Sequence, residues 1–262
     1  FDCATDGKTI LTGAPKFSSA KGRIVAFDFC DADSTSVRNT TTSTAYTTLD
    51  SAISAATAGQ SITAAAGAFD TASIDLGAKP LIVSSRSALS TNYNSLIMLS
   101  NGAQLAAAPD SQMQIFGSFY SSTNAGLVRL SAGSVAFGPA STVFIEPGTT
   151  FFSTPMAAFR GTTNFRSSAS IANFTGTADF EGTLNIPAGA QISASNDINF
   201  GGSAKMVSTT LSAGGTVSFR TFTSMTSSTI SADSIYIAPS GTFTGAGTVM
   251  ANMTVAGKFI PT

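Results

Sequence analysis

The chain has 262 residues, of which 43% are hydrophobic and only 10% are charged, and its formal net charge is −1. This hydrophobic share excludes wholesale disorder, and the near-neutral charge argues against a nucleic-acid-binding protein, which needs a basic surface. The chain contains no histidine, the commonest general base, and no apolar run long enough to cross a bilayer.

Residues 1–60 are predicted to form an N-terminal cap. This segment holds the chain's two cysteines, Cys3 and Cys30, and a strand-like stretch at 23–29. Two cysteines cannot build a Cys-based zinc site, and they favour one disulfide that ties down the N-terminal segment. The alternative is two unrelated free thiols.

Three Asn-X-Thr sequons, at Asn39, Asn173 and Asn252, favour a secreted protein, although a chain rich in Ser and Thr produces some by chance. The sequence shows no signal peptide, which fits a mature form from which the signal has been removed. Together with the cysteine pair, the sequons lead us to expect an extracellular or cell-surface location.

A short helix is predicted near the end of the cap, because apolar residues recur there at i, i+3, i+4 and i+7. Thr47 followed by Asp50 fits a capping box, and Gly59 stands where the C′ residue of a helix belongs. The apolar stripe consists of Leu49, Ala52, Ile53 and Ala56.

The runs at 49–56, 58–62 and 66–69 read LDSAISAA, AGQSI and AGAF. They resemble the opening of pectin-lyase-like parallel β-helix proteins, in which a short amphipathic helix plugs the end of the solenoid. The resemblance covers about 40 residues and implies a right-handed β-helix. It says little about activity, because that superfamily includes polysaccharide lyases, hydrolases, phage tailspikes and non-enzymatic surface proteins.

Residues 61–262 are predicted to form the β-helix itself, with turns of about 18–22 residues. Three series of apolar residues recur in phase, so each turn is expected to contribute three short strands. Stacking the turns at about 4.8 Å would place five Phe side chains in one aromatic column. The series are Met113/Ile115, Val135/Phe137, Ala157/Phe159, Ala178/Phe180, Ile198/Phe200, Val217/Phe219, Ile235/Ile237 and Met253/Val255; Ile145, Phe165, Ile186, Met206, Met225 and Phe243; and Leu130, Phe151, Ile171, Ile192, Leu211, Ile230 and Val249.

The predicted fold is therefore all-β: a single-stranded, three-sided parallel β-helix with a short N-terminal capping helix. A β-sandwich is the alternative, but it has no reason to keep three ladders in phase over many turns. The resemblance favours a right-handed helix, whereas the near-six-residue spacing of the last turns also suits a left-handed one. Bends with positive φ are expected at the Gly-Thr pairs Gly148-Thr149, Gly161-Thr162, Gly176-Thr177, Gly182-Thr183 and Gly241-Thr242.

One cluster of charged residues is expected on the outside, formed by Arg160, Asp179 and Glu181 beside Asn199. A polysaccharide lyase needs carboxylates for calcium or a poised Lys or Arg base, and a hydrolase needs paired carboxylates. No second carboxylate stacks on either acid, so a solvated Arg160–Glu181 ion pair is the simpler interpretation. Because the sequence also lacks a nucleophile–base pair, a phosphate loop and a cofactor motif, we expect no enzyme activity, metal or cofactor.

The third series predicts a flat, uncharged strip of small polar side chains, which we call the Ser/Thr surface. It resembles the Thr rows of ice-binding β-solenoids, although Phe152, Gln191 and Met250 interrupt it. It also suits packing against a neighbouring molecule, since a neutral surface resists association poorly, or it simply covers strands where charge is scarce. Its candidate residues are Thr150, Ser170, Gln191, Thr210, Ser212, Thr229, Ser231 and Thr248.

Taken together, these features predict a non-catalytic, secreted structural or surface protein, such as a filament, wall or adhesin subunit. The expected partner is another copy of the chain or another extracellular matrix or surface component, with glycans or ice as further candidates. An ice-binding protein and a pectin-lyase-like polysaccharide lyase or hydrolase are the alternative functions.

Overall fold

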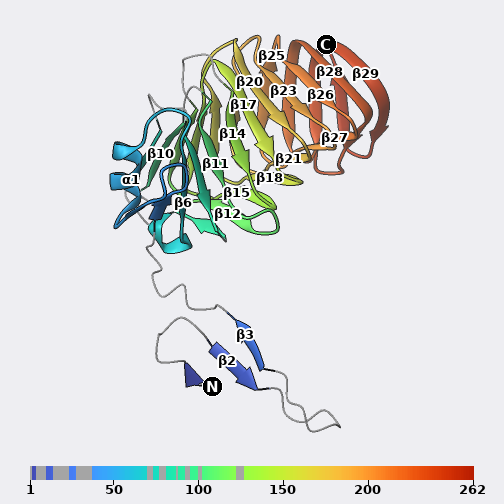
Figure 1. Cartoon of the computed structure of the whole chain (residues 1–262). Helices are drawn as coiled ribbons and strands as arrows, with labels where there is room; N and C mark the ends of the chain where they lie inside the picture. The colour runs from blue at the N-terminus through green and yellow to red at the C-terminus, as the bar shows by residue number, and fades with distance from the viewer. Residues whose placement is uncertain are drawn as a thin grey trace.

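The structure is a computed structural model in which the chain forms a β-solenoid of about nine turns (Figure 1). The all-β, parallel β-helix fold expected from the sequence is confirmed, with one short helix near the N-terminus. Right-handedness stays a prediction. The structure describes residues 2–3, 10–13, 24–27, 37–69, 73–76, 81–86, 88–91, 95–99, 102–121 and 127–262.

Three faces run along the solenoid, because each strand from β7 to β25 pairs in parallel with the strand three places later. Face I consists of β7 (Ser73–Asp75), β10 (Leu96–Leu99), β13 (Ser118–Ser121), β16 (Thr142–Ile145), β19 (Thr162–Phe165), β22 (Leu184–Asn185) and β25 (Ala204–Val207). Face II consists of β6 (Ser61–Ala64), β8 (Ile82–Ser85), β11 (Gln104–Ala106), β14 (Val128–Ser131), β17 (Gly148–Ser153), β20 (Ser170–Phe174), β23 (Gln191–Ala194) and β26 (Thr210–Ala213). Face III consists of β9 (Leu89–Ser90), β12 (Gln112–Ile115), β15 (Ser134–Phe137), β18 (Met156–Phe159), β21 (Thr177–Phe180), β24 (Ile198–Phe200) and β27 (Thr216–Phe219).

The C-terminal turns are more continuous. β28 (Phe222–Ile237) and β29 (Thr242–Val255) each cross all three faces, and β30 (Lys258–Pro261) pairs with β29 on face I. The β28–β29 pairing shifts register twice, between Thr226 and Ser228 and between Ser231 and Ser234, where the chain passes from one face to the next.

The N-terminal end of the solenoid carries β4 (Val37–Asn39), β5 (Thr44–Tyr46) and α1 (Leu49–Ala55), and α1 contacts β4, β5 and β6. The predicted apolar stripe of α1 is buried, as expected for a helix that covers the end of a core. The predicted cap was one residue off: Thr48, not Thr47, is the N-cap and accepts from the backbone N–H of Ser51. Gly59 has a positive φ of 81°, but it lies in the turn after the helix, whose C-cap is Ala56.

A separate antiparallel sheet is formed by β1 (Asp2–Cys3), β2 (Ile10–Gly13) and β3 (Ile24–Phe27), the last within the strand-like stretch expected at 23–29. Cys30 and the side chain of Cys3 lie outside the described part of the chain, so the disulfide stays a prediction. No helix in the described part is long and apolar enough to span a membrane.

The core contains the predicted aromatic column. The rings of successive turns lie 4.8–5.8 Å apart between centroids and are nearly parallel, with interplanar angles of 11–17°. A second stack, Phe152 on Phe174 at 4.5 Å, meets the first edge to face. The column consists of Phe137, Phe159, Phe180, Phe200 and Phe219, all buried.

The predicted register is wrong at two places. In β17 and β20 the inward residues are Phe152 and Ala172, because Leu130 pairs with Phe152 and Phe152 with Phe174, so Phe151 and Ile171 face outward. At the other place, Phe243 pairs with Thr223 rather than with Met225. At the first place, either of two adjacent Phe residues can point inward in a strand whose side chains alternate between the two sides. At the second place, an irregular passage between faces changes the number of residues in the turn and so shifts which residues pair.

The glycines of the bends are required mainly by close packing rather than by positive φ. Among the five Gly-Thr pairs only Gly148 has a positive φ, of 115°. A Cβ at Gly182 would stand 1.9 Å from the carbonyl oxygen of Gly161 on the preceding turn. Glycine is therefore needed there because successive backbones approach too closely for any side chain.

Candidate interaction surfaces

The Ser/Thr surface exists on face II, but it is shorter than the sequence suggests. Thr150 and Ser170 are only 1% and 0% exposed, so their predicted outward orientation is wrong, for the register reason given above. The other candidates lie on the outside of the last turns. They form two columns, one of Gln191, Thr210, Thr229 and Thr248, and a second in which Ser212 and Ser231 lie between Ser193 and Met250.

Two properties of this surface bear on its chemistry. From β17 to β29, the residues paired on face II are all uncharged. The nearest acid in these strands is exposed Asp233 of β28, two residues after Ser231, where the strand passes on to face III. The hydroxyls of Thr210, Ser212, Thr229 and Ser231 make no side-chain hydrogen bond to any other described residue and are open to the outside. On the preceding turns the first column holds Thr149 and Ile171, and the second holds Phe151 and Asn173, so each column gains one large apolar side chain.

The charged cluster lies at the edge of face III. Arg160 Nε contacts Glu181 Oε2 at 3.2 Å, and both side chains are largely exposed, which confirms the expected ion pair between turns. Asp179 pairs in register with Asn199, but its Oδ1 is buried without a hydrogen-bond partner. Burial and then the Glu181 charge raise the pKa of Asp179, against the opposing effect of Arg220 and Arg160.

This cluster falls short of a hydrolytic centre. Glu181 is held by Arg160, so Asp179 has no free carboxylate beside it to act as its partner. Within the described residues, no group of three or more His, Cys, Asp or Glu side chains could hold a metal ion. The arrangement therefore gives no positive support for the lyase or hydrolase alternative.

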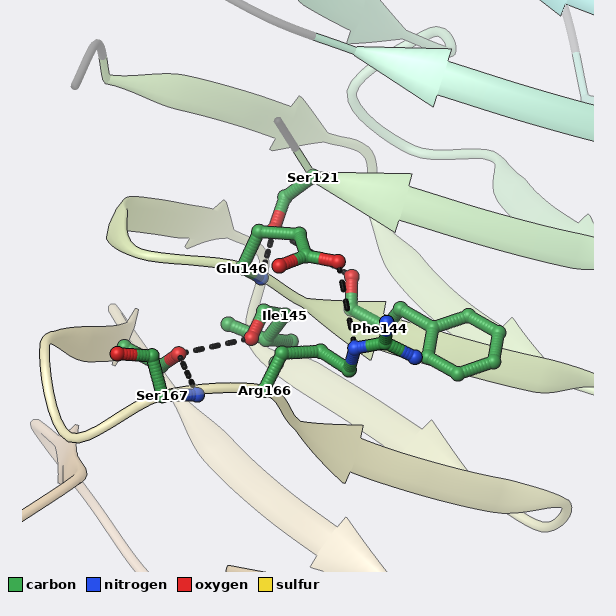
Figure 2. A network of polar contacts seen from close by, with 7 residues as sticks. Ser121, Phe144, Ile145, Glu146, Arg166 and Ser167 are labelled. Carbon is green, nitrogen blue, oxygen red and sulfur yellow. Dashed lines mark hydrogen bonds and ion pairs between the residues drawn. The ribbon is translucent and has the colours of Figure 1, made fainter. Parts of the chain in front are cut away.

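Sequence reasoning missed a third surface feature, on face I (Figure 2). Tyr120 stacks on Phe144 with ring centroids 4.4 Å apart. The guanidinium of Arg166 lies 5.1 Å from the Phe144 ring centroid. Arg166 Nε also contacts Glu146 Oε1 at 3.5 Å, and Ser121 Oγ accepts from the Glu146 backbone N–H. Glu146 and Arg166 are 20 residues apart, so the turn length was the signal that could have paired them.

The three sequons differ in their surroundings. Asn39 is only 1% exposed, its amide nitrogen donates to Gln60 Oε1 at 2.7 Å, and its Oδ1 accepts from the backbone N–H groups of Thr41 and Thr42. The Asn39 side chain is therefore engaged within the fold, and a glycan at this sequon stays a prediction. Asn173 lies on the outside of face II, where its Oδ1 accepts from Ser193 Oγ, and Asn252 is exposed on face III, so both remain candidate acceptors.

Comparison of the chain with known protein families, curated proteins and solved structures gave no match.

Proposed function

We propose that the protein is a non-catalytic structural rod of the extracellular space or cell surface, whose Ser/Thr surface packs against a second copy of the chain. The proposal includes a right-handed β-helix of the pectin-lyase-like type. The single observation that carries it is the outer side of face II from β23 to β29, where the residues paired on this face are uncharged and Thr210, Ser212, Thr229 and Ser231 present free hydroxyls.

The core supports the role of a stiff rod. Each turn contributes a Phe ring that stacks on the ring of the next turn, from Phe137 to Phe219. Because the turns are also joined by continuous parallel hydrogen-bonded ladders, bending the solenoid would have to separate both the rings and the strands. Such a rod transmits force along its axis and presents the same spacing of side chains on every turn.

The side of the rod supports self-association. Charged side chains oppose burial because their desolvation is costly, and like charges repel two copies of one chain. From β17 to β29 the residues paired on face II carry no charge, and Asp233 lies beyond them, where β28 passes on to face III. Hydroxyls that repeat at about 4.8 Å can exchange hydrogen bonds with an identical column on the neighbour, so the surface complements itself.

Sedimentation velocity of the double variant Thr210→Lys/Thr229→Lys tests this proposal. The two positions pair on adjacent turns, so the variant places two positive charges next to each other on the Ser/Thr surface. We expect the wild type to sediment as a concentration-dependent assembly and the variant as a monomer. Thr183→Lys/Ser203→Lys is the matched control, since both residues are exposed on adjacent turns away from face II. Equal assembly of all three proteins would contradict the proposal.

Ice binding is the second candidate, and the two hydroxyl columns are the observation that favours it. Outward hydroxyls without protein partners on regularly spaced strands can order water. This function requires a monomer that shows thermal hysteresis and shapes growing ice crystals, and the Thr210→Lys/Thr229→Lys variant should lose both properties. Assembly without hysteresis supports the structural rod, and hysteresis of a monodisperse monomer supports ice binding.

A further inference from the structure

Face I is hollowed where its strand β22 is shortest. β22 has only two residues, whereas β19 and β25 on either side have four. The strand ends at Asn185, two residues before Pro187, which has no backbone N–H to continue the ladder. A cavity of about 490 Å³ opens at this break, within the size range of small-molecule sites.

The hollow combines an apolar floor with one cation. Leu184, Ile186 and Val207 are among the residues that line it, and Lys205 and Asn185 supply its polar groups. Asn185 donates one amide hydrogen to Asn164 Oδ1 at 2.7 Å, which leaves its second amide hydrogen available to a ligand.

Lys205 has no acidic partner among the described residues. Its register neighbours on the turns before and after are Asn185 and Ser224, which are uncharged. Glu146 lies three turns earlier on face I and is paired with Arg166, whose guanidinium lies between the Glu146 carboxylate and the Phe144 ring (Figure 2). An ammonium at the rim of an apolar hollow without a counter-charge is complementary to an anionic group attached to an apolar body.

We propose that this hollow binds a small amphiphilic carboxylate, with the carboxylate at Lys205 and the apolar chain over Leu184, Ile186 and Val207. A single ammonium and one amide N–H match a monoanionic carboxylate, whereas a doubly charged phosphate would call for more donors than the site offers. This site lies on face I and is independent of the packing surface on face II.

Titration of the full chain with octanoate, followed by isothermal calorimetry and by NMR shifts of the lining residues, tests the proposal. A ligand of this size should bind with a Kd of the order of 1–10 mM. Octylammonium, which has the same chain and the opposite charge, should bind about fivefold or more weakly. Lys205→Met should weaken octanoate binding about three- to fivefold and remove the preference for the anion, because an exposed charge pair contributes about that factor.

Lys258→Met is the matched control, since Lys258 lies on face I three turns further along the chain and does not line the hollow. It should leave octanoate binding unchanged. Three results would overturn the proposal: no saturable octanoate binding below about 50 mM, equal binding of octylammonium, or an unchanged affinity in Lys205→Met when its circular dichroism spectrum and melting point match those of the wild type.

Discussion

Replacing Phe180 with alanine removes the middle ring of the aromatic column. Phe180 is 1% exposed, and its ring lies 4.9 Å from that of Phe159 and 5.8 Å from that of Phe200, centroid to centroid. It also meets Phe174 edge to face at 6.2 Å. The substitution therefore leaves a cavity bordered by rings that belong to two other turns, which cannot collapse into it without breaking the strand register.

A Phe→Ala change at such a site costs about 3–5 kcal/mol of the free energy of unfolding. At an m value of about 3 kcal/mol per M urea, a loss of about 4 kcal/mol lowers the unfolding midpoint by about 1.3 M, which circular dichroism can measure. Phe222→Ala is the control, because Phe222 is 52% exposed and its loss should shift the midpoint little. Equal midpoints for Phe180→Ala and the wild type would refute the stacked core and the register built on it.

Three further predictions concern charge, redox state and activity. Burial raises the pKa of Asp179 in the folded state, so ionising this carboxyl lowers the free energy of unfolding as the pH rises from 3.8 through the folded-state pKa. Asp179→Asn should therefore melt at a higher temperature than the wild type at pH 7, and the two melting points should converge below the ordinary pKa of 3.8. Alkylation of unreduced protein should label neither Cys3 nor Cys30 in mass spectrometry, and two labelled thiols would rule out the disulfide and weaken the extracellular assignment. Incubation with pectate or alginate and calcium should release no unsaturated product, and turnover that disappears in Arg160→Ala would establish an enzyme instead.

The sequence was sufficient for face III because its spacing is unambiguous. Apolar residues alternate with polar or small ones in strand after strand, and the paired register follows the predicted series from Met113 to Val255. Because side chains alternate between the two sides of a strand, only one register buries all the apolar residues of these short strands.

Face II shows where such reasoning stops. Phe151 and Phe152 are adjacent, so either can point inward in a pattern of period two, and the choice is made by packing against Leu130 and Phe174. This one-residue error reversed the orientation of Thr150 as well. The shift at Phe243 has a different origin, because the irregular passages of β28 change the number of residues between faces.

Predicting which surface residues meet on neighbouring turns also requires the number of residues in each turn. The Arg160–Glu181 ion pair was predictable, since both residues follow directly after a Phe of the aromatic column. The same reasoning applies to the Arg166–Glu146 pair, which was missed although both residues directly follow members of the second series, Phe165 and Ile145. The Tyr120–Phe144 stack was not predictable, because the predicted series on face I began only at Ile145. The hollow beside Lys205 forms because β22 has only two residues, and the spacing of apolar residues in the sequence does not predict where a strand ends early.

Electron microscopy of the purified protein tests the central claim of a self-associating rod most directly. Wild-type molecules should appear as rods aligned side by side in pairs or sheets, and the Thr210→Lys/Thr229→Lys variant should appear as single rods of unchanged shape, because both substitutions lie on the outer side of face II. Wild-type molecules that remain single and dispersed at every concentration, indistinguishable from the variant, would contradict it.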